Sequence, residues 1–231
     1  MKKLLAFAIL LFTLSPLALR AQECMGVSLK QGSGYELLSY DAKGKENGRM
    51  IYKVKKVSKD GPDTVIEMDL ETFDKKDKSQ MTNTFTMRCN GNEMHLDASS
   101  MMPQGQGKQF ESFDMTFTSK DIIYPANLSV GQTLPDGSLH GEGAAGPMSM
   151  TMDTEFVNRK VEGREKITVP AGTFDTFKIT SDMNINMKSV MKMNMEFSTV
   201  SYRSPKILWD VKTENYRKGK LMGTTVLSKI L

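Results

Sequence analysis

The 231-residue sequence contains few of the residues from which catalytic and metal sites are usually built. It has two histidines, His95 and His140, and two cysteines, Cys24 and Cys89. It has no Gly-x-Ser-x-Gly, no phosphate- or dinucleotide-binding glycine motif and no His-Glu-x-x-His. His140 has Glu142 two residues later, a pair that resembles a weak acid–base or metal site. We expect a protein that is not an enzyme and that needs neither a cofactor nor a metal.

The sequence also lacks a sustained helical period after its first 21 residues, which argues against a helical fold. Apolar and polar residues alternate instead, as at Phe85, Met87 and Cys89, which are separated by Thr86 and Arg88. A period of two is typical of strands with one apolar face. The sequence therefore predicts an all-β, mainly antiparallel fold with little helix beyond the N-terminal segment.

One long apolar run is found at the N-terminus. Lys2 and Lys3 precede apolar residues 4–19, and Arg20 and Ala21 follow. This order is that of a secretory signal peptide, with cleavage near Ala21. An uncleaved membrane anchor is the alternative. Against it, a proline and Arg20 shorten the run below the roughly 20 residues that a membrane-spanning helix needs. We expect an exported protein, periplasmic or secreted, that is soluble after cleavage.

Neither positive nor negative charge predominates in the remaining chain. The formal net charge of the whole sequence is +4. Residues 1–21 contain three basic residues and no acidic ones, so the mature chain carries a charge of +1. Because basic and acidic residues are interleaved, no basic stripe is left for binding nucleic acid.

Cys24 and Cys89 form an even pair in an exported chain, which favours a disulfide. Two buried free thiols are the alternative. Lipidation of Cys24 is a second possibility, but the acidic Glu23 before it departs from the small residue that a bacterial lipidation signal requires.

A turn pattern recurs three times, with an aromatic residue, a short polar lysine-rich stretch and a new strand, at residues 40–45, 73–78 and 216–220. Gly44 and Gly219 stand where such hairpins need a positive φ, and Asp77 takes that place in the second copy. We interpret the three stretches as solvated hairpin tips.

Glycine and proline are concentrated in residues 125–147. We therefore expect an N-terminal β half at 22–124, a connecting segment at 125–147 and a C-terminal β half at 148–231. The two halves would form one structural unit, as an open barrel, clam or sandwich.

Several segments resemble a known family. They are Tyr124–Leu128, Val130–Gly137, Asn158–Gly163, Val169–Phe174 with Lys178–Ile179, and Tyr202 with Val211–Tyr216 and Gly219–Leu221. Together they resemble the TapB-like (DUF3108-like) family of exported bacterial proteins. The resemblance implies an open-barrel or clam-like all-β fold outside the cytoplasm and implies no activity. Where the family has a glycine-containing turn, this chain reads Ile207–Lys212, without glycine.

Methionine is abundant, with 19 residues, and many alternate along expected strands. The candidate ligand-binding set is Met148, Met150, Met152, Met183, Met187, Met191, Met193, Met195 and Phe197. Three hypotheses fit this pattern: ordinary core packing, an adaptable apolar groove for a lipid or other apolar small molecule, and Cu(I) binding through Met-x-Met. We favour a non-enzymatic apolar-ligand protein. A structural or assembly protein of the cell envelope that binds a protein partner is the alternative function.

Overall fold

The computed structural model describes residues 22–99, 115–145 and 147–231. The expected signal peptide, residues 1–21, lies outside the described residues. No helix in the described part is long and apolar enough to cross a membrane.

The described residues form strands in two antiparallel sheets. A small sheet pairs β1 (Gln22–Cys24) with β2 (Val27–Leu29). The large sheet has thirteen strands in the order β8-β10-β11-β12-β13-β14-β15-β3-β4-β5-β6-β7-β9. Their bounds are β3 Gly34–Asp41, β4 Glu46–Asp60, β5 Asp63–Asp74, β6 Ser79–Cys89, β7 Glu93–Leu96, β8 Thr116–Lys120, β9 Ile122–Pro125, β10 Gly137–Ala145, β11 Met148–Val169, β12 Gly172–Lys188, β13 Lys192–Arg203, β14 Asp210–Arg217 and β15 Lys220–Ile230. The prediction of an all-β antiparallel fold is confirmed.

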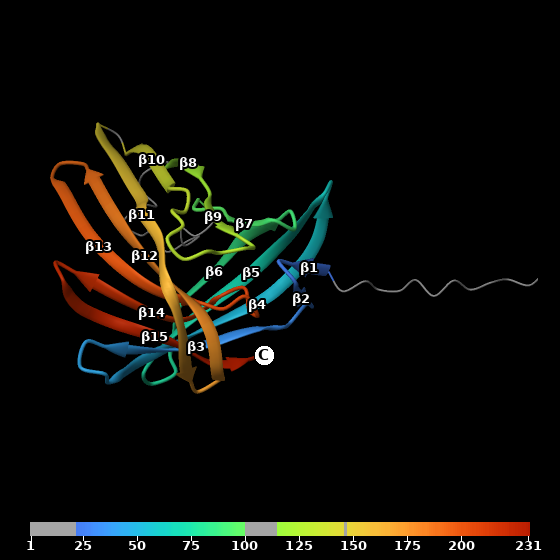
Figure 1. The fold of residues 1–231 in the computed structure, drawn as a ribbon. Coiled ribbons are helices and arrows are strands. Elements are labelled where there is room, and N and C mark those ends of the chain that lie inside the picture. The colour runs from blue at the N-terminus through green and yellow to red at the C-terminus, as the bar shows by residue number, and fades with distance from the viewer. Residues whose placement is uncertain (1–21, 100–114, 146) are drawn as a thin grey trace, which may run out of the picture.

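The large sheet curves into a nearly closed barrel whose two walls face each other (Figure 1). Its edge strands, β8 and β9, are separated in the chain by Asp121 alone. β8 pairs with β10, whereas β9 pairs with β7 on the opposite wall. The chain itself therefore joins the two edges of the sheet. Closure of this kind protects edge strands that would otherwise be exposed.

The two predicted halves share this one sheet, because β15 near the C-terminus pairs with β3 near the N-terminus. Residues 125–147, which the sequence suggested as a connection, contain the strand β10, which lies between β8 and β11. The glycines there are compatible with a strand. Gly141 leaves space for the ring of Phe117, because a Cβ at position 141 would lie only 2.6 Å from that ring.

The main core fills the barrel beside strands β3–β7. Its aromatic centre is Tyr52, Phe85 and Trp209, whose ring centroids lie 4.2–6.1 Å apart. The loop before β14 contributes the buried side chains Ile207 and Leu208. The hydroxyl of Tyr35 accepts a hydrogen bond from the Leu208 amide at 3.1 Å, which ties this loop to β3. The loop thus occupies one end of the barrel.

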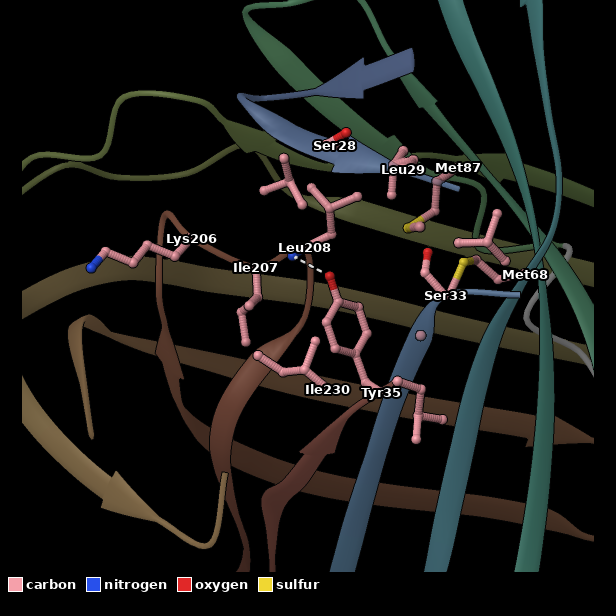
Figure 2. A pocket seen from close by; sticks show the side chains of 14 residues that line it. Ser28, Leu29, Ser33, Tyr35, Met68, Met87, Lys206, Ile207, Leu208 and Ile230 are labelled. Atoms are coloured by element: carbon pink, nitrogen blue, oxygen red, sulfur yellow. Dashed lines mark hydrogen bonds between the residues drawn. The ribbon is translucent and has the colours of Figure 1, made fainter. Parts of the chain in front are cut away.

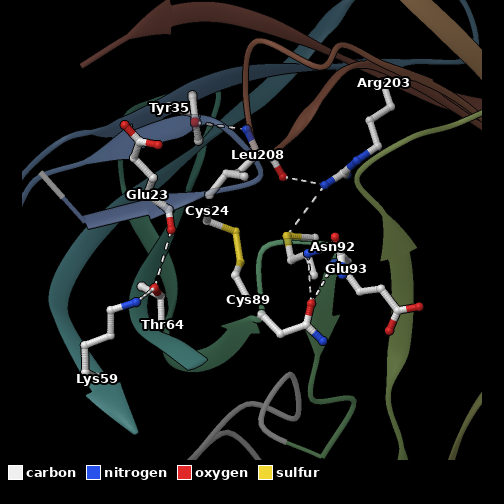
Figure 3. Close-up of a disulfide and its surroundings, with 12 residues drawn as sticks. Glu23, Cys24, Tyr35, Lys59, Thr64, Cys89, Asn92, Glu93, Arg203 and Leu208 are labelled. Atoms are coloured by element: carbon white, nitrogen blue, oxygen red, sulfur yellow. Dashed lines mark hydrogen bonds between the residues drawn. A yellow bond between two sulfur atoms is a disulfide. The ribbon is translucent and has the colours of Figure 1, made fainter. Parts of the chain in front are cut away.

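The small sheet packs at the same end and is held there by a covalent link. Figure 3 shows the disulfide between Cys24 on β1 and Cys89 on β6, which agrees with the disulfide expected from the sequence. Next to it, the Thr64 hydroxyl donates to the Glu23 carbonyl at 3.4 Å and accepts from Lys59 Nζ at 2.8 Å. The disulfide therefore anchors a two-stranded sheet that would be only marginally stable by itself.

The three recurrent turns are hairpin turns, as predicted. Gly44, Asp77 and Gly219 all have positive φ, at 74°, 58° and 72°. In the first, the Asp41 carboxylate accepts hydrogen bonds from the amides of Lys43 and Lys45, both at 2.9 Å. Asp74 accepts the equivalent pair in the second turn. The aspartates that end β3 and β5 thus stabilise the turns that follow these two strands.

Candidate functional site

A cavity of about 260 Å³ lies inside the barrel between its two walls. The β7–β9 wall contributes Met94, Ile122 and Tyr124. The opposite wall, β11–β14, contributes apolar side chains such as Met183 together with hydroxyl groups such as those of Thr199 and Thr213. Several of the lining side chains are partly exposed, including Met183 and Thr199, so solvent reaches the cavity.

The alternation of β12 and β13 determines which side chains face this cavity. Ser181 and Met183 on β12 and Thr199 and Ser201 on β13 line it, so odd-numbered residues point inward on both strands. The later methionines of these strands are also odd-numbered and therefore lie on the same inward face.

These inward residues form a cross-strand ladder. Met183 lies opposite Phe197, Ile185 opposite Met195, and Met187 opposite Met193. We call these six residues the Met ladder. It begins at the cavity with Met183 and ends near the β12–β13 hairpin tip (Figure 1), where Met193 is 46% exposed. The strands thus carry a row of apolar side chains from the hairpin tip to the cavity, in which Met187 packs against neighbouring core residues and Met183 lines the cavity.

The predicted methionine set divides into three groups. Met150 and Met152 are buried, and Met187 packs against the small second core that Met152 forms with Ala98 and Leu139. Met183 lines the cavity, while Met195 and Phe197 are partly exposed on the ladder. Met148, Met191 and Met193 are exposed, Met191 by 82%. The structure therefore brings part of the set together at the cavity and the ladder.

Copper binding stays a prediction. Met187 and Met193 lie directly opposite each other on neighbouring strands, which places two thioethers on one face. Competition of the protein with a Cu(I) chelator tests it.

Two arginines lie in the cavity wall, and the sequence reasoning missed both. Arg159 and Arg203 are only 2% and 5% exposed. The guanidinium carbons lie 4.7 and 4.1 Å from the ring centroid of Tyr124, so both stack on this ring. The Arg203 guanidinium also donates to the Asp210 carboxylate at 3.1 Å and to the Leu208 carbonyl at 2.8 Å.

A bulge turns Arg159 toward the interior. On β11 the even-numbered Met150, Met152 and Thr154 are buried, but after Asn158 the odd-numbered Arg159 and Val161 are. Asn158 has a φ of 53°, and the register with β12 shifts there by one residue. The change of apolar parity between Phe156 and Val161 was the sequence signal that could have revealed this bulge.

His140 lies on the outer face of β10, away from the cavity. Its Nδ1 lies 2.6 Å from a carboxylate oxygen of Asp153 on β11, and its Nε2 lies 3.9 Å from Glu142. The hydrogen bond to Asp153 raises the pKa of His140 above its ordinary value. His95 similarly contacts Glu93 at 3.1 Å. Among the described residues, no group of three or more His, Cys, Asp or Glu side chains is arranged to bind a metal.

A second hollow, of about 130 Å³, lies at the end of the barrel where the small sheet packs (Figure 2). It is lined by apolar side chains from both sheets and the Ile207–Leu208 loop, including Leu29, Met68 and Ile230. It is smaller than the cavity at the Met ladder and contains no buried charge, so we regard it as a gap between packed elements.

These features define a nearly closed, single-sheet β barrel with an internal cavity. The model of the DUF3108-like family matches residues 30–227, which is most of the chain, and the protein belongs to this family. The family resemblance seen in the sequence is thereby confirmed. No curated protein matches the chain.

Two solved structures share the fold. One is a Parabacteroides distasonis protein described as a candidate lipoprotein, with a TM-score of 0.68 and 23% identity over 91% of this chain and 100% of that one. The other is a Bacteroides fragilis protein described as a candidate exported protein with a YmcC-like fold, with a TM-score of 0.65 and 18% identity over 89% and 98% of the two chains. At these identities the likeness establishes the common fold alone.

Proposed function

We propose that this protein is exported, catalyses no reaction, and binds an apolar ligand along the Met ladder and in the adjoining cavity. The observation that carries the proposal is the continuity of the ladder, which runs from the exposed hairpin tip to Met183 in the cavity wall. Apolar side chains that are only partly covered in the free protein can bury further area when a ligand binds.

The size of the cavity suggests how a ligand would lie. Its volume of about 260 Å³ is slightly below the range of about 300–1,000 Å³ that is common for small-molecule sites. A long apolar chain would therefore extend beyond the cavity and lie along the ladder. Methionine is suited to such contacts because its flexible thioether side chain adapts to ligands of different shape.

Export is supported by three observations. The N-terminal segment has the order of a signal peptide. The Cys24–Cys89 disulfide is typical of an oxidising compartment. The two structural relatives are described as exported or as a lipoprotein.

The mature protein is proposed to be free of lipid, because the sulfur of Cys24 is in the disulfide and cannot also form a thioether to a lipid. Intact-mass measurement of the mature protein tests this. The expected mass is that of a chain cleaved near Ala21 with one disulfide and no lipid, and a diacylglyceryl adduct would contradict it.

Ligand binding is tested first with protein purified from its own compartment without detergent. Organic extraction and mass spectrometry are expected to recover an apolar compound in a stoichiometric amount. The purified protein is then titrated with N-phenyl-1-naphthylamine, an apolar dye that fluoresces when it leaves water.

A matched pair of variants locates the site. Met195→Glu places a charge in the middle of the Met ladder and is expected to weaken dye binding by tenfold or more, because binding would bury an unpaired carboxylate. Met222→Glu is the control, since Met222 lies on β15 outside the ladder and the cavity and is already 52% exposed. Equal affinities for the two variants, or no dye binding by the wild-type protein, would refute the proposal.

A further inference from the structure

Arg159 is a buried cation without an acidic partner among the described residues. One of its terminal nitrogens, Nη1, donates hydrogen bonds to the backbone carbonyls of Ile123 and Pro135. The other, Nη2, is buried and has no hydrogen-bond partner. None of the ion pairs in the described part of the chain involves Arg159.

The charge of the cavity wall is consequently unbalanced. Two guanidinium groups, those of Arg159 and Arg203, stand against one carboxylate in the lining, that of Asp210. Asp210 is already engaged by Arg203 at 3.1 Å. Among the described residues that line the cavity, one positive charge is therefore left without a carboxylate partner at the inner end of the Met ladder.

An uncompensated buried charge is costly, because burial removes the water that would otherwise stabilise it. The same low polarity strengthens the attraction between this charge and an anion that enters the cavity. A guanidinium is well matched to oxyanions, since its planar N–H donors fit carboxylate and phosphate groups. The polar hydroxyls of Thr199, Ser201 and Thr213 lie in the same wall and can hydrogen-bond a headgroup.

We propose that the cavity binds the anionic oxyacid headgroup of an amphiphile, with Arg159 supplying the unpaired charge and the Met ladder holding the apolar chain. This inference rests on the proposed function, because it specifies the chemical class of the same ligand. Arg159 Nη2 is covered by protein atoms in the ligand-free structure. Direct contact with a headgroup therefore requires a side-chain rotation of Arg159 or of Tyr124, which stacks on it, and the cavity beside both residues provides the space.

Three probes of equal chain length test the inference by displacement of N-phenyl-1-naphthylamine from the full mature protein at pH 7. They are dodecanoate, dodecyl phosphate and dodecanol. Wild-type protein is expected to bind dodecanoate or dodecyl phosphate about tenfold or more tightly than dodecanol, which corresponds to one hydrogen bond to a charged group. The comparison of the two anions shows whether a carboxylate or a phosphate headgroup fits better.

The variant Arg159→Gln is expected to lose this preference, so that it binds dodecanoate and dodecyl phosphate no more tightly than dodecanol. Arg164→Gln is the matched control, because the Arg164 guanidinium stacks on Phe177 at 4.5 Å outside the cavity. It should keep the wild-type preference. If both variants lose the preference equally, the effect comes from general surface charge and the inference is overturned.

Asp210→Asn provides a second test that does not depend on the folding of the Arg159 variant. Removing the one carboxylate of the lining leaves Arg203 unpaired as well, so the preference for the anion should increase severalfold. An unchanged or smaller preference would overturn the inference. Equal wild-type affinities for dodecanol and dodecanoate would refute the inference and leave the proposed function intact, whereas binding of none of the probes would refute both.

Discussion

Reduction of the Cys24–Cys89 disulfide is expected to destabilise the folded protein strongly. The bond closes a loop with a sequence separation of 65 residues. In the chain-entropy relation, a cross-link over a loop of this length restricts the unfolded chain by about 4 kcal/mol at 25 °C. Loss of the bond should act first on the small β1–β2 sheet. This sheet is not part of the large sheet, and the disulfide is its covalent link to β6.

The measurement is equilibrium unfolding in guanidinium chloride of the mature protein with the disulfide intact and after reduction by a thiol. Both samples keep both sulfur atoms, so the comparison isolates the cross-link from the loss of side-chain volume. Trp209 is the single tryptophan of the chain and lies against Tyr52 and Phe85 in the core, so its fluorescence reports the transition.

The expected result is a fall in unfolding free energy of about 4 kcal/mol on reduction. The small sheet should also separate from the barrel, so a protease is expected to cleave between β1 and β2 in the reduced protein before the barrel unfolds. A difference below about 1 kcal/mol would refute the reasoning, because it would mean that the loop is already restricted in the unfolded chain or that the packing of the small sheet suffices.

Two further predictions concern β10. The pKa of His140, raised by its hydrogen bond to Asp153, should return toward 6.5 in Asp153→Asn, as measured by NMR titration; an unchanged pKa would contradict the contact. Because this pKa is higher in the folded state than in the unfolded state, the pair stabilises the fold fully below the unfolded-state pKa and loses its effect as pH rises through the folded-state pKa. Gly141→Ala should cost about 1–3 kcal/mol in urea unfolding, since the new Cβ would meet the Phe117 ring. Gly163→Ala is its control, because a Cβ there has nothing within 4 Å, and equal losses for both variants would show that the contact is unimportant.

Local patterns allowed the fold class and the turns to be predicted. Alternation such as that of Phe85, Met87 and Cys89 has one structural solution, a strand with an apolar face, and all three side chains are buried. The turn residues were equally informative, because Gly44 and Asp77 belong to residue types that adopt a positive φ more readily than most. Both signals act over a few residues and need no knowledge of distant contacts.

The candidate site was predicted only in part. The alternation of Met183 and Met187 correctly placed both on one face of a strand, but it could not show that the first would line a cavity and the second would pack against the cluster of Ala98, Leu139 and Met152. Whether a methionine lines the cavity or packs in a core depends on the residues of the opposite wall, and these come from strands distant in the sequence.

Most strands, their hairpin turns and the disulfide of the two cysteines could be predicted from the sequence, because each follows from the conformational preferences or chemistry of the residues involved. The closure of the sheet and the side chains that face its interior depend instead on long-range contacts. The pairing of β15 with β3 and the crossing of the chain at Asp121 form the barrel. The bulge at Asn158 then turns Arg159 inward. A one-residue shift of register exchanges the two faces of a strand, so the burial of that charge depends on long-range pairing as much as on the residue itself.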